Sequence, residues 1–147
     1  MIAPRRGPLL VLMWRIHRAV YRLSGGRLGS RLGPFRTLLL TTTGRKSGRA
    51  VRVVLSYVDS DGDPVVTASN SGEQRHPGWY LNLLAHPVGE VRIGRERRRV
   101  RARTTIGAER ERLWREFVMR DRSYAEYQRR TRRPIPVVVL ERAESAA

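Results

Sequence analysis

Residues 41–49 combine the groups that bind an anion. The run Thr41-Thr-Thr-Gly-Arg-Lys-Ser-Gly-Arg49 places two glycines, three cationic side chains and several hydroxyls after an apolar stretch. Glycines let backbone N–H groups approach an anion closely, arginine offers a planar fork to phosphate or carboxylate, and lysine adds a point charge. The glycine spacing is not that of a P-loop, and no helical pattern follows. The segment therefore predicts a phosphate-binding loop, with a solvated basic turn as the alternative.

A second segment, residues 68–87, has side chains that suit a flat ring. It reads Ala68-Ser-Asn-Ser-Gly-Glu-Gln-Arg-His-Pro-Gly-Trp-Tyr-Leu-Asn-Leu-Leu-Ala-His-Pro87. Small polar residues leave a strand, and aromatic residues begin a helix. Trp79 and Tyr80 offer flat faces and Asn82 offers an amide, so the segment can bracket a planar ligand. Packing of Trp79 in the core is the alternative.

Two tyrosines, Tyr124 and Tyr127, share one face of a predicted helix because they are three residues apart. Their phenols can donate hydrogen bonds at the wall of a substrate pocket, and packing against the domain is the alternative. His17, His76 and His86 lack the spacing of metal ligands, so we expect no metal site.

These segments belong to a chain that predicts mostly antiparallel strands. Apolar and β-branched runs predict strands at residues 37–43, 51–58, 65–69, 91–93, 100–105 and 136–140, with turns near 59–63 and 94–97. Helical patterns cover residues 79–86, 108–119 and 123–130. Hairpin connections without regular βαβ alternation predict a mainly β, α+β fold, an antiparallel barrel of about six strands with a helix before the last strand.

Residues 8–23 predict an N-terminal helix with Arg15, Arg18 and Arg22 on one face. Its apolar run is shorter than the ~18–20 residues that span a bilayer, and the pattern is not that of a signal peptide. The helix either lies on an anionic membrane surface or covers the domain. We expect residues 1–34 to form this helix and a Gly-rich linker, 35–142 the barrel domain and 143–147 a tail.

The charge of the chain limits the classes of partner that we expect it to bind. The 147 residues carry 30 Lys+Arg and 13 Asp+Glu, a net charge of +17, with no cysteine. Residues 1–58 hold twelve of the basic residues and no acidic one. Such a charge favours nucleic acid, an anionic membrane surface or a polyanionic ligand. No helix-turn-helix, zinc-finger or RRM signature is present, so we expect no nucleic-acid partner. The lack of cysteine excludes a disulfide framework and permits a cytoplasmic location.

Three segments in order carry a family resemblance. They are Leu38-Leu-Leu-Thr-Thr-Thr-Gly-Arg-Lys-Ser-Gly48, Ala68-Ser-Asn-Ser-Gly72 and His76-Pro-Gly-Trp-Tyr-Leu-Asn-Leu83, followed by Tyr124-Ala-Glu-Tyr-Gln-Arg-Arg-Thr-Arg-Arg-Pro-Ile-Pro-Val-Val-Val139. Over residues 35–141 the chain resembles the deazaflavin (coenzyme F420)-dependent nitroreductase and quinone reductase family of actinobacteria.

The resemblance implies a split β-barrel that binds reduced coenzyme F420, an 8-hydroxy-5-deazaflavin with a phosphodiester and a polyglutamate tail. FMN is the alternative cofactor. The implied reaction is hydride transfer from the deazaflavin to an oxidised acceptor such as a quinone or a nitroaromatic. The alternatives are a split-barrel protein that binds the deazaflavin or a flavin without turning it over, and a basic nucleic-acid-binding module.

The resemblance also implies roles for single residues. The loop from Gly44 to Gly48 matches the one that takes the phosphate and tail, Ser69 and Asn70 match the turn beside the ring, and a later segment matches the one that closes over it. The expected cofactor-binding residues are Thr43, Gly44, Arg45, Lys46, Ser47, Gly48, Arg52, Ser69, Asn70, Trp79, Tyr80 and Asn82. The expected catalytic residues are Ser69, Tyr124 and Tyr127, with the two tyrosines as candidate proton donors.

The acceptor side departs from the family pattern. Ser56 stands where nitroreducing members have a tyrosine on the second strand, and Asp121 stands where they have the first of a late group of tyrosines. With Tyr124 and Tyr127 these residues form the expected substrate pocket, for a small-molecule acceptor. The expected location is the cytoplasm, and of the two alternatives for residues 8–23, the membrane one would place the protein on the inner face of the cell membrane.

Overall fold

The computed structural model describes residues 31–32 and 35–143. The predicted helix at residues 8–23, and with it the membrane hypothesis, lies outside these residues, as do residues 144–147 of the predicted tail. No helix in the described part of the chain is both long and apolar enough to cross a bilayer.

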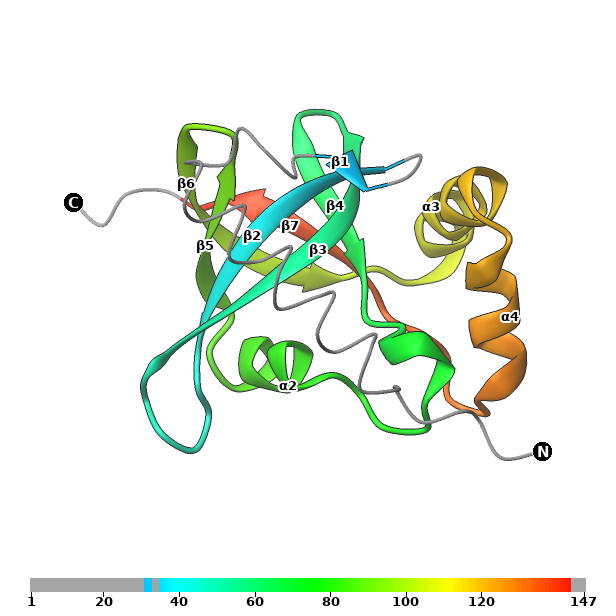
Figure 1. Ribbon diagram of the computed structural model, residues 1–147, viewed down its shortest axis with the longest axis horizontal. Helices are drawn as coiled ribbons and strands as arrows, with labels where there is room; N and C mark the ends of the chain where they lie inside the picture. The colour runs from blue at the N-terminus through cyan, green and yellow to red at the C-terminus, as the bar shows by residue number, and fades with distance from the viewer. Residues whose placement is uncertain (1–30, 33–34, 144–147) are drawn as a thin grey trace.

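Six antiparallel strands close into a barrel (Figure 1). The order of pairing is β2 (Phe35–Thr43), β3 (Ala50–Ser60), β4 (Asp63–Thr67), β7 (Val137–Arg142), β6 (Glu96–Thr104) and β5 (Val88–Ile93), which returns to β2. Closure rests on three residue pairs between β2 and β5. Gly89 lies at this seam, where a Cβ atom would stand 2.6 Å from the backbone oxygen of Thr41, so only glycine permits the approach. The predicted α+β split barrel is confirmed.

Three strands differ from the sequence-based expectation. Strand β5 begins at Val88, three residues before the predicted start at residue 91. A two-residue strand, β1 (Arg31–Leu32), pairs with β2 inside the segment expected to be a linker. Strand β6 begins at Glu96 rather than at residue 100. Along this strand, exposed arginines alternate with residues that are more buried. Pairing with β5 makes this charged run a strand, although its composition gives little strand signal.

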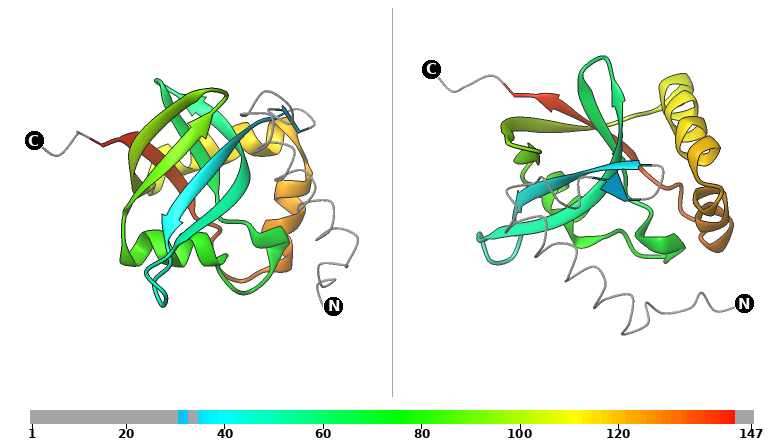
Figure 2. Two further views of the ribbon diagram at one scale, coloured as in Figure 1. Left: turned by 60° about the vertical axis from the view of Figure 1, so that its left-hand side comes forward. Right: turned by 45° about the horizontal axis from the view of Figure 1, so that its top comes forward.

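Within the described residues, three α-helices and one 3₁₀ turn complete the fold. The turn η1 (Asn70–Gly72) leads to α2 (Gly78–Ala85), while α3 (Gly107–Arg120) and α4 (Ser123–Arg130) precede β7. In the views of Figures 1 and 2, α3 and α4 lie together on one side of the barrel. The predicted helices at 79–86, 108–119 and 123–130 agree closely with these bounds.

Alternate residues of the strands serve two hydrophobic cores. Leu38, Leu40 and Val66 belong to a cluster that includes β5–β7 residues and α2, and it fills the barrel. Phe35, Val58, Val65, Leu113 and Phe117 belong to a second cluster, between the outer face of the barrel and α3. Because successive strand side chains point to opposite faces, one strand contributes to both clusters. The burial of this apolar surface is the main term that holds the helices on the barrel.

Candidate functional site

The barrel opens between β3 and β4. Eight residue pairs join β2 to β3, but only three join β3 to β4, and these end at the pair Val58–Val65. Beyond that pair the chain of β4 leaves β3 and continues through η1 into α2. In Figure 1 the β2–β3 loop lies near one end of α2, and η1 with α4 lies near the other. The predicted site residues are therefore distributed along one side of the barrel.

The β2–β3 loop is a closed turn that presents cations to solvent. The Gly44 N–H donates to the backbone oxygen of Arg49 at 2.7 Å, and the Gly48 N–H donates to that of Gly44 at 2.8 Å. Gly48 has a φ of 71°, which a side chain would strain. Arg45, Lys46, Ser47, Gly48 and Arg49 are all exposed.

The side chains of Lys46 and Arg49 are open to an anion. Neither makes an ion pair or a side-chain hydrogen bond within the described residues. Two exposed cations on a turn closed by backbone hydrogen bonds fit a phosphodiester and a carboxylate tail. Arg52 is exposed on β3, just beyond the loop, and extends the same positive surface.

Asn82 of α2 holds this loop in place through hydrogen bonds. Its Oδ1 accepts hydrogen bonds from the Arg45 backbone N–H and from Arg45 Nη1, both at 3.1 Å, and its Nδ2 donates to Thr42 Oγ1 at 3.1 Å. Asn82 is 4% exposed. The amide expected to face the cofactor ring is therefore engaged by the β2–β3 loop, 37 residues away in sequence.

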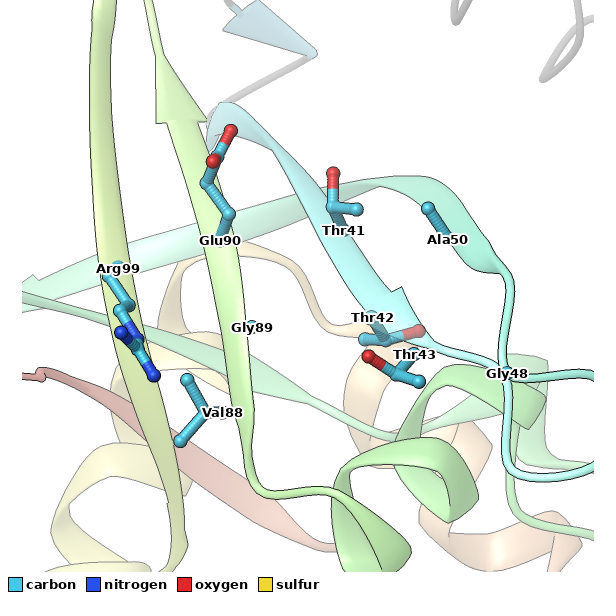
Figure 3. Close-up of a pocket in the computed structure, with 9 residues that line it drawn as sticks. All are labelled: Thr41, Thr42, Thr43, Gly48, Ala50, Val88, Gly89, Glu90 and Arg99. Atoms are coloured by element: carbon cyan, nitrogen blue, oxygen red, sulfur yellow. The ribbon is translucent and has the colours of Figure 1, made fainter. Parts of the chain in front are cut away.

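A hollow of about 440 Å³ adjoins the same loop on the outside of the barrel (Figure 3). It is lined by Thr41, Thr42, Thr43, Gly48, Ala50, Val88, Gly89, Glu90 and Arg99. Thr43, at the end of β2, contributes a half-buried hydroxyl. The lining offers hydroxyls, backbone groups and one side chain of each charge, Glu90 and Arg99, which suit a polar chain better than an aromatic ring.

The turn expected beside the ring is strained. Asn70, Ser71 and Gly72 have φ values of 47°, 55° and 80°, three left-handed residues in succession. Such a conformation costs about 1–2 kcal/mol for each residue with a side chain, so other contacts must hold it. The Asn70 Nδ2 donates to the backbone oxygen of Arg75 at 3.1 Å and to Glu73 at 3.2 Å. Asn70 thus closes the turn, while the neighbouring Ser69 is half-buried.

Arg133 was not predicted as a site residue, yet its guanidinium donates to three backbone oxygens of this turn and to His76. Arg133 stands in the basic run Arg-Arg-Thr-Arg-Arg, where nothing in the sequence distinguishes it from its neighbours. Gln74 adds a second tie, because its Nε2 donates to the backbone oxygen of Arg130 at 3.0 Å.

The aromatic residues of α2 are packed in the barrel. Trp79 and Tyr80 are each 7% exposed and belong to the interior cluster. The Tyr80 hydroxyl lies 3.0 Å from Thr104 Oγ1. The Trp79 and Tyr80 rings meet edge to face. The burial of Trp79 agrees with the packing alternative given for it, and Tyr80 packs beside it, because the first turn of α2 closes the end of the barrel. The expected contact of both residues with a ring stays a prediction.

Hydroxyl groups gather at the acceptor end. Burial raises the pKa of Tyr124 well above its ordinary value, and hydrogen bonds to Thr67 and Ser56 oppose that rise. The Tyr124 ring also meets Tyr127 edge to face, with ring centroids 5.6 Å apart. Ser56, Tyr124 and Tyr127 therefore come together as expected from the sequence, and Thr67 joins them.

Asp121 lies close enough to Tyr124 for its charge to raise the pKa of that phenol, and it also meets the start of α4. Its Oδ1 accepts a hydrogen bond from the Ser123 N–H at 2.9 Å, at the start of α4. This carboxylate satisfies a free N–H of the first turn and lies where the helix dipole favours negative charge. No group of three His, Cys, Asp or Glu side chains in the described residues can hold a metal ion.

Comparisons with known proteins agree with this geometry. A family model described as "F420H(2)-dependent quinone reductase" matches residues 12–142. An F420H(2)-dependent quinone reductase of Mycobacterium tuberculosis (strain H37Rv) is 42% identical over 138 residues, which are 90% of this chain and 91% of the relative.

Solved structures give the same picture. An F420-H2 dependent reductase (FDR-A) has a TM-score of 0.66 at 40% identity, covering 71% of this chain and 93% of that one. A protein described as a domain-swapped dimer has a TM-score of 0.68 at 36% identity, covering 92% and 100%. A haem storage protein of Vibrio cholerae, at 13% identity and a TM-score of 0.56, shares the fold alone. Sequence, fold and cationic loop together show that the chain belongs to the F420H2-dependent quinone reductase family.

Proposed function

We propose that this F420H2-dependent oxidoreductase reduces a quinone at the opening between β3 and β4, with the phenol of Tyr124 at the acceptor end. The observation that carries the proposal is that the Ser56 and Thr67 hydroxyls lie near the buried Tyr124 phenol, where they lower its pKa against the effect of burial. The cationic β2–β3 loop lies toward the other end, so a molecule with an anionic tail and a flat head spans the two.

The cofactor end is built for a polyanion. When bound, reduced F420 supplies the hydride that the acceptor receives. Lys46 and Arg49 are exposed and suit the phosphodiester and the carboxylates of the tail, while Asn82 holds the loop that carries them. The protein itself needs no nucleophile, because its residues bind, orient and exclude water.

The acceptor end supplies hydrogen-bond donors. A quinone that accepts a hydride develops negative charge on oxygen, and a positioned donor stabilises that charge. The raised pKa of Tyr124 keeps its phenol neutral, so it remains a donor throughout the pH range of ordinary assays. Tyr127, whose ring meets that of Tyr124, is the second candidate donor.

Nitroaromatics are the poorer acceptors in this proposal. Ser56 is much smaller than the tyrosine that the resemblance places at its position, and Asp121 is engaged at the start of α4. Two phenols that would contact a nitro group are therefore missing from this chain.

The test is steady-state oxidation of reduced F420, followed by the return of deazaflavin fluorescence, with menadione and with a nitroaromatic as acceptors. We expect a higher kcat/KM for menadione. Tyr124→Phe should lower kcat about a hundredfold with little change in the Kd of reduced F420. Tyr57→Phe is the matched control, because it removes a buried phenol of the barrel interior.

Three results separate the alternatives. Binding of reduced F420 without oxidation by any quinone would identify a deazaflavin-binding protein without turnover. Binding of FMN in place of F420 would overturn the cofactor assignment. An unchanged kcat for Tyr124→Phe would remove Tyr124 from the reaction and leave Tyr127 as the donor to be tested.

A further inference from the structure

We propose that Arg133 is a positioning residue: its guanidinium latches residues 68–76 into the conformation that receives the cofactor ring. This inference rests on the proposed function, together with the resemblance, which implies that the ring lies beside Ser69 and Asn70. Arg133 lies between α4 and β7, more than 50 residues away in sequence, and contacts no part of the anion-binding loop among its recorded hydrogen bonds.

Four hydrogen bonds form the latch. Arg133 Nη1 donates to the backbone oxygen of Ala68 at 3.1 Å, and Nη2 donates to that of Ser69 at 3.0 Å. Arg133 Nε donates to the backbone oxygen of Glu73 at 3.0 Å, and Nη1 also lies 3.1 Å from His76 Nδ1. The acceptors stand on both sides of η1, so one rigid side chain fixes the two ends of the strained turn.

The chemistry of these acceptors explains why an arginine is present. None of the four is a carboxylate oxygen, so this half-buried guanidinium does not serve as half of an ion pair. Only a planar fork with five N–H donors reaches several carbonyls in one plane. A lysine ammonium is a point donor at the end of a flexible stem and cannot span the same set.

The latched turn needs an external constraint. Asn70 and Ser71 hold left-handed φ values without being glycine, and Gly72 packs directly against α4. Strained backbone persists only where its surroundings over-determine it, and such strain gathers at ligand sites. Without Arg133 the turn would relax, and the backbone beside the ring would lose its fixed position.

His76 makes the latch sensitive to pH. Its Nδ1 accepts a hydrogen bond from a cation only when that nitrogen is unprotonated. The groups that face the imidazole are the Arg133 guanidinium and the Tyr80 ring, 5.0 Å away, and Glu73 lies near Arg133. Burial, and then the charge of Arg133, hold the pKa of His76 below its ordinary value. The latch is intact at neutral pH and weakens as pH falls through this lowered pKa, because a protonated imidazole repels the guanidinium.

The first test compares Arg133→Met and Arg133→Lys with Arg132→Met. The Arg132 side chain is exposed and makes no hydrogen bond or ion pair in the part of the chain that the structure describes. We expect both Arg133 variants to raise the Kd of reduced F420 about tenfold, with the same factor for a tail-less deazaflavin, because the ring end is affected. Lysine should not rescue binding. Arg132→Met should bind like the wild type.

Hydrogen exchange supplies a readout that needs no cofactor. Amides of residues 69–76 should exchange at least about tenfold faster in Arg133→Met than in the wild type, with barrel amides unchanged. A folded Arg133→Met protein with wild-type Kd and wild-type exchange at 69–76 would overturn the proposal. If residues 69–76 exchange faster in Arg133→Met than in the wild type, but the wild type binds no F420, the proposed function fails while the latch stands.

A second variant keeps the proposal open to refutation if Arg133→Met does not fold. His76→Asn retains a hydrogen-bond acceptor near the position of Nδ1 and does not titrate. The Kd of the tail-less deazaflavin should rise for the wild type as pH falls below about 6.5, the ordinary pKa of histidine, and should stay level for His76→Asn. An equal acid-dependent rise in both proteins would contradict the latch.

Discussion

Single residues serve the β2–β3 loop in two distinct ways. Lys46 is exposed and makes no ion pair with any residue that the structure describes, so its charge remains available to a ligand. Asn82 is buried, and its side-chain amide is hydrogen-bonded to Arg45 and Thr42. One residue thus contributes charge and the other contributes geometry, and the two functions should separate in experiments.

Lys46→Ala should raise the Kd of reduced F420 about tenfold, since a charge-assisted contact with the tail is lost, while the free energy of unfolding stays unchanged. Arg95→Ala is the matched control, because Arg95 is exposed in the β5–β6 turn. Fluorescence titration with F420 and with a tail-less deazaflavin measures the effect. An equal loss for both ligands would contradict the assignment of Lys46 to the tail.

At the scale of elements, η1 and α4 form one unit. A Cβ atom on Gly72 would lie 2.7 Å from the backbone oxygen of Tyr127 and 2.9 Å from its Cα. The turn beside the expected ring position therefore rests on the helix that carries the acceptor-side tyrosines. The positions of η1 and of the tyrosines on α4 are therefore linked by direct packing.

Gly72→Ala should destabilise the protein more than Gly62→Ala. Both glycines have a positive φ, 80° and 89°, so both substitutions pay a similar backbone cost of about 1–2 kcal/mol. Gly62 has no neighbour within 4 Å of the added Cβ, whereas Gly72 meets α4, which should cost about 1–3 kcal/mol more. Urea unfolding measures the difference, and equal losses would show that α4 is not packed against the turn.

At the scale of the whole molecule, an aromatic cluster joins the helical layer to the barrel. Phe117 of α3 stacks on Phe35 of β2 at 5.6 Å and meets Tyr124 of α4 edge to face at 5.2 Å. Phe117 is fully buried. The position of the candidate donor Tyr124 thus depends on packing between three elements.

Phe117→Ala should lower the free energy of unfolding by about 3–5 kcal/mol, because it leaves a cavity in a closed core. Met119→Ala on the same helix is the control; its side chain is 86% exposed, and it should change stability by less than about 0.5 kcal/mol. If Phe117→Ala remains folded, its kcat should be lower than that of the wild type. The kcat of Tyr124→Phe serves as the reference for loss of the Tyr124 phenol. Full activity in a folded Phe117→Ala protein would separate the cluster from the site.

The fold could be predicted well because its signals are local. Hairpin turns at residues 61–62 and 94–95, the apolar strands and the helix patterns all lie within short windows. The β2–β3 loop was also predictable, since glycines and cations stand next to each other in the chain. Strand β6 was partly missed, because its outward arginines carry no hydrophobic signal and its pairing partners lie elsewhere.

The sequence by itself determined the order of strands and helices, the cationic loop and the family, because each depends on residues close together in the chain. Only the tertiary structure decided which residues do the positioning. Asn82 and Arg133 act on loops 37 and more than 50 residues away, and Trp79 packs in the interior cluster of the barrel. Hydrogen bonds of this kind depend on where the chain is brought together in space, and neither residue type nor spacing encodes that distance.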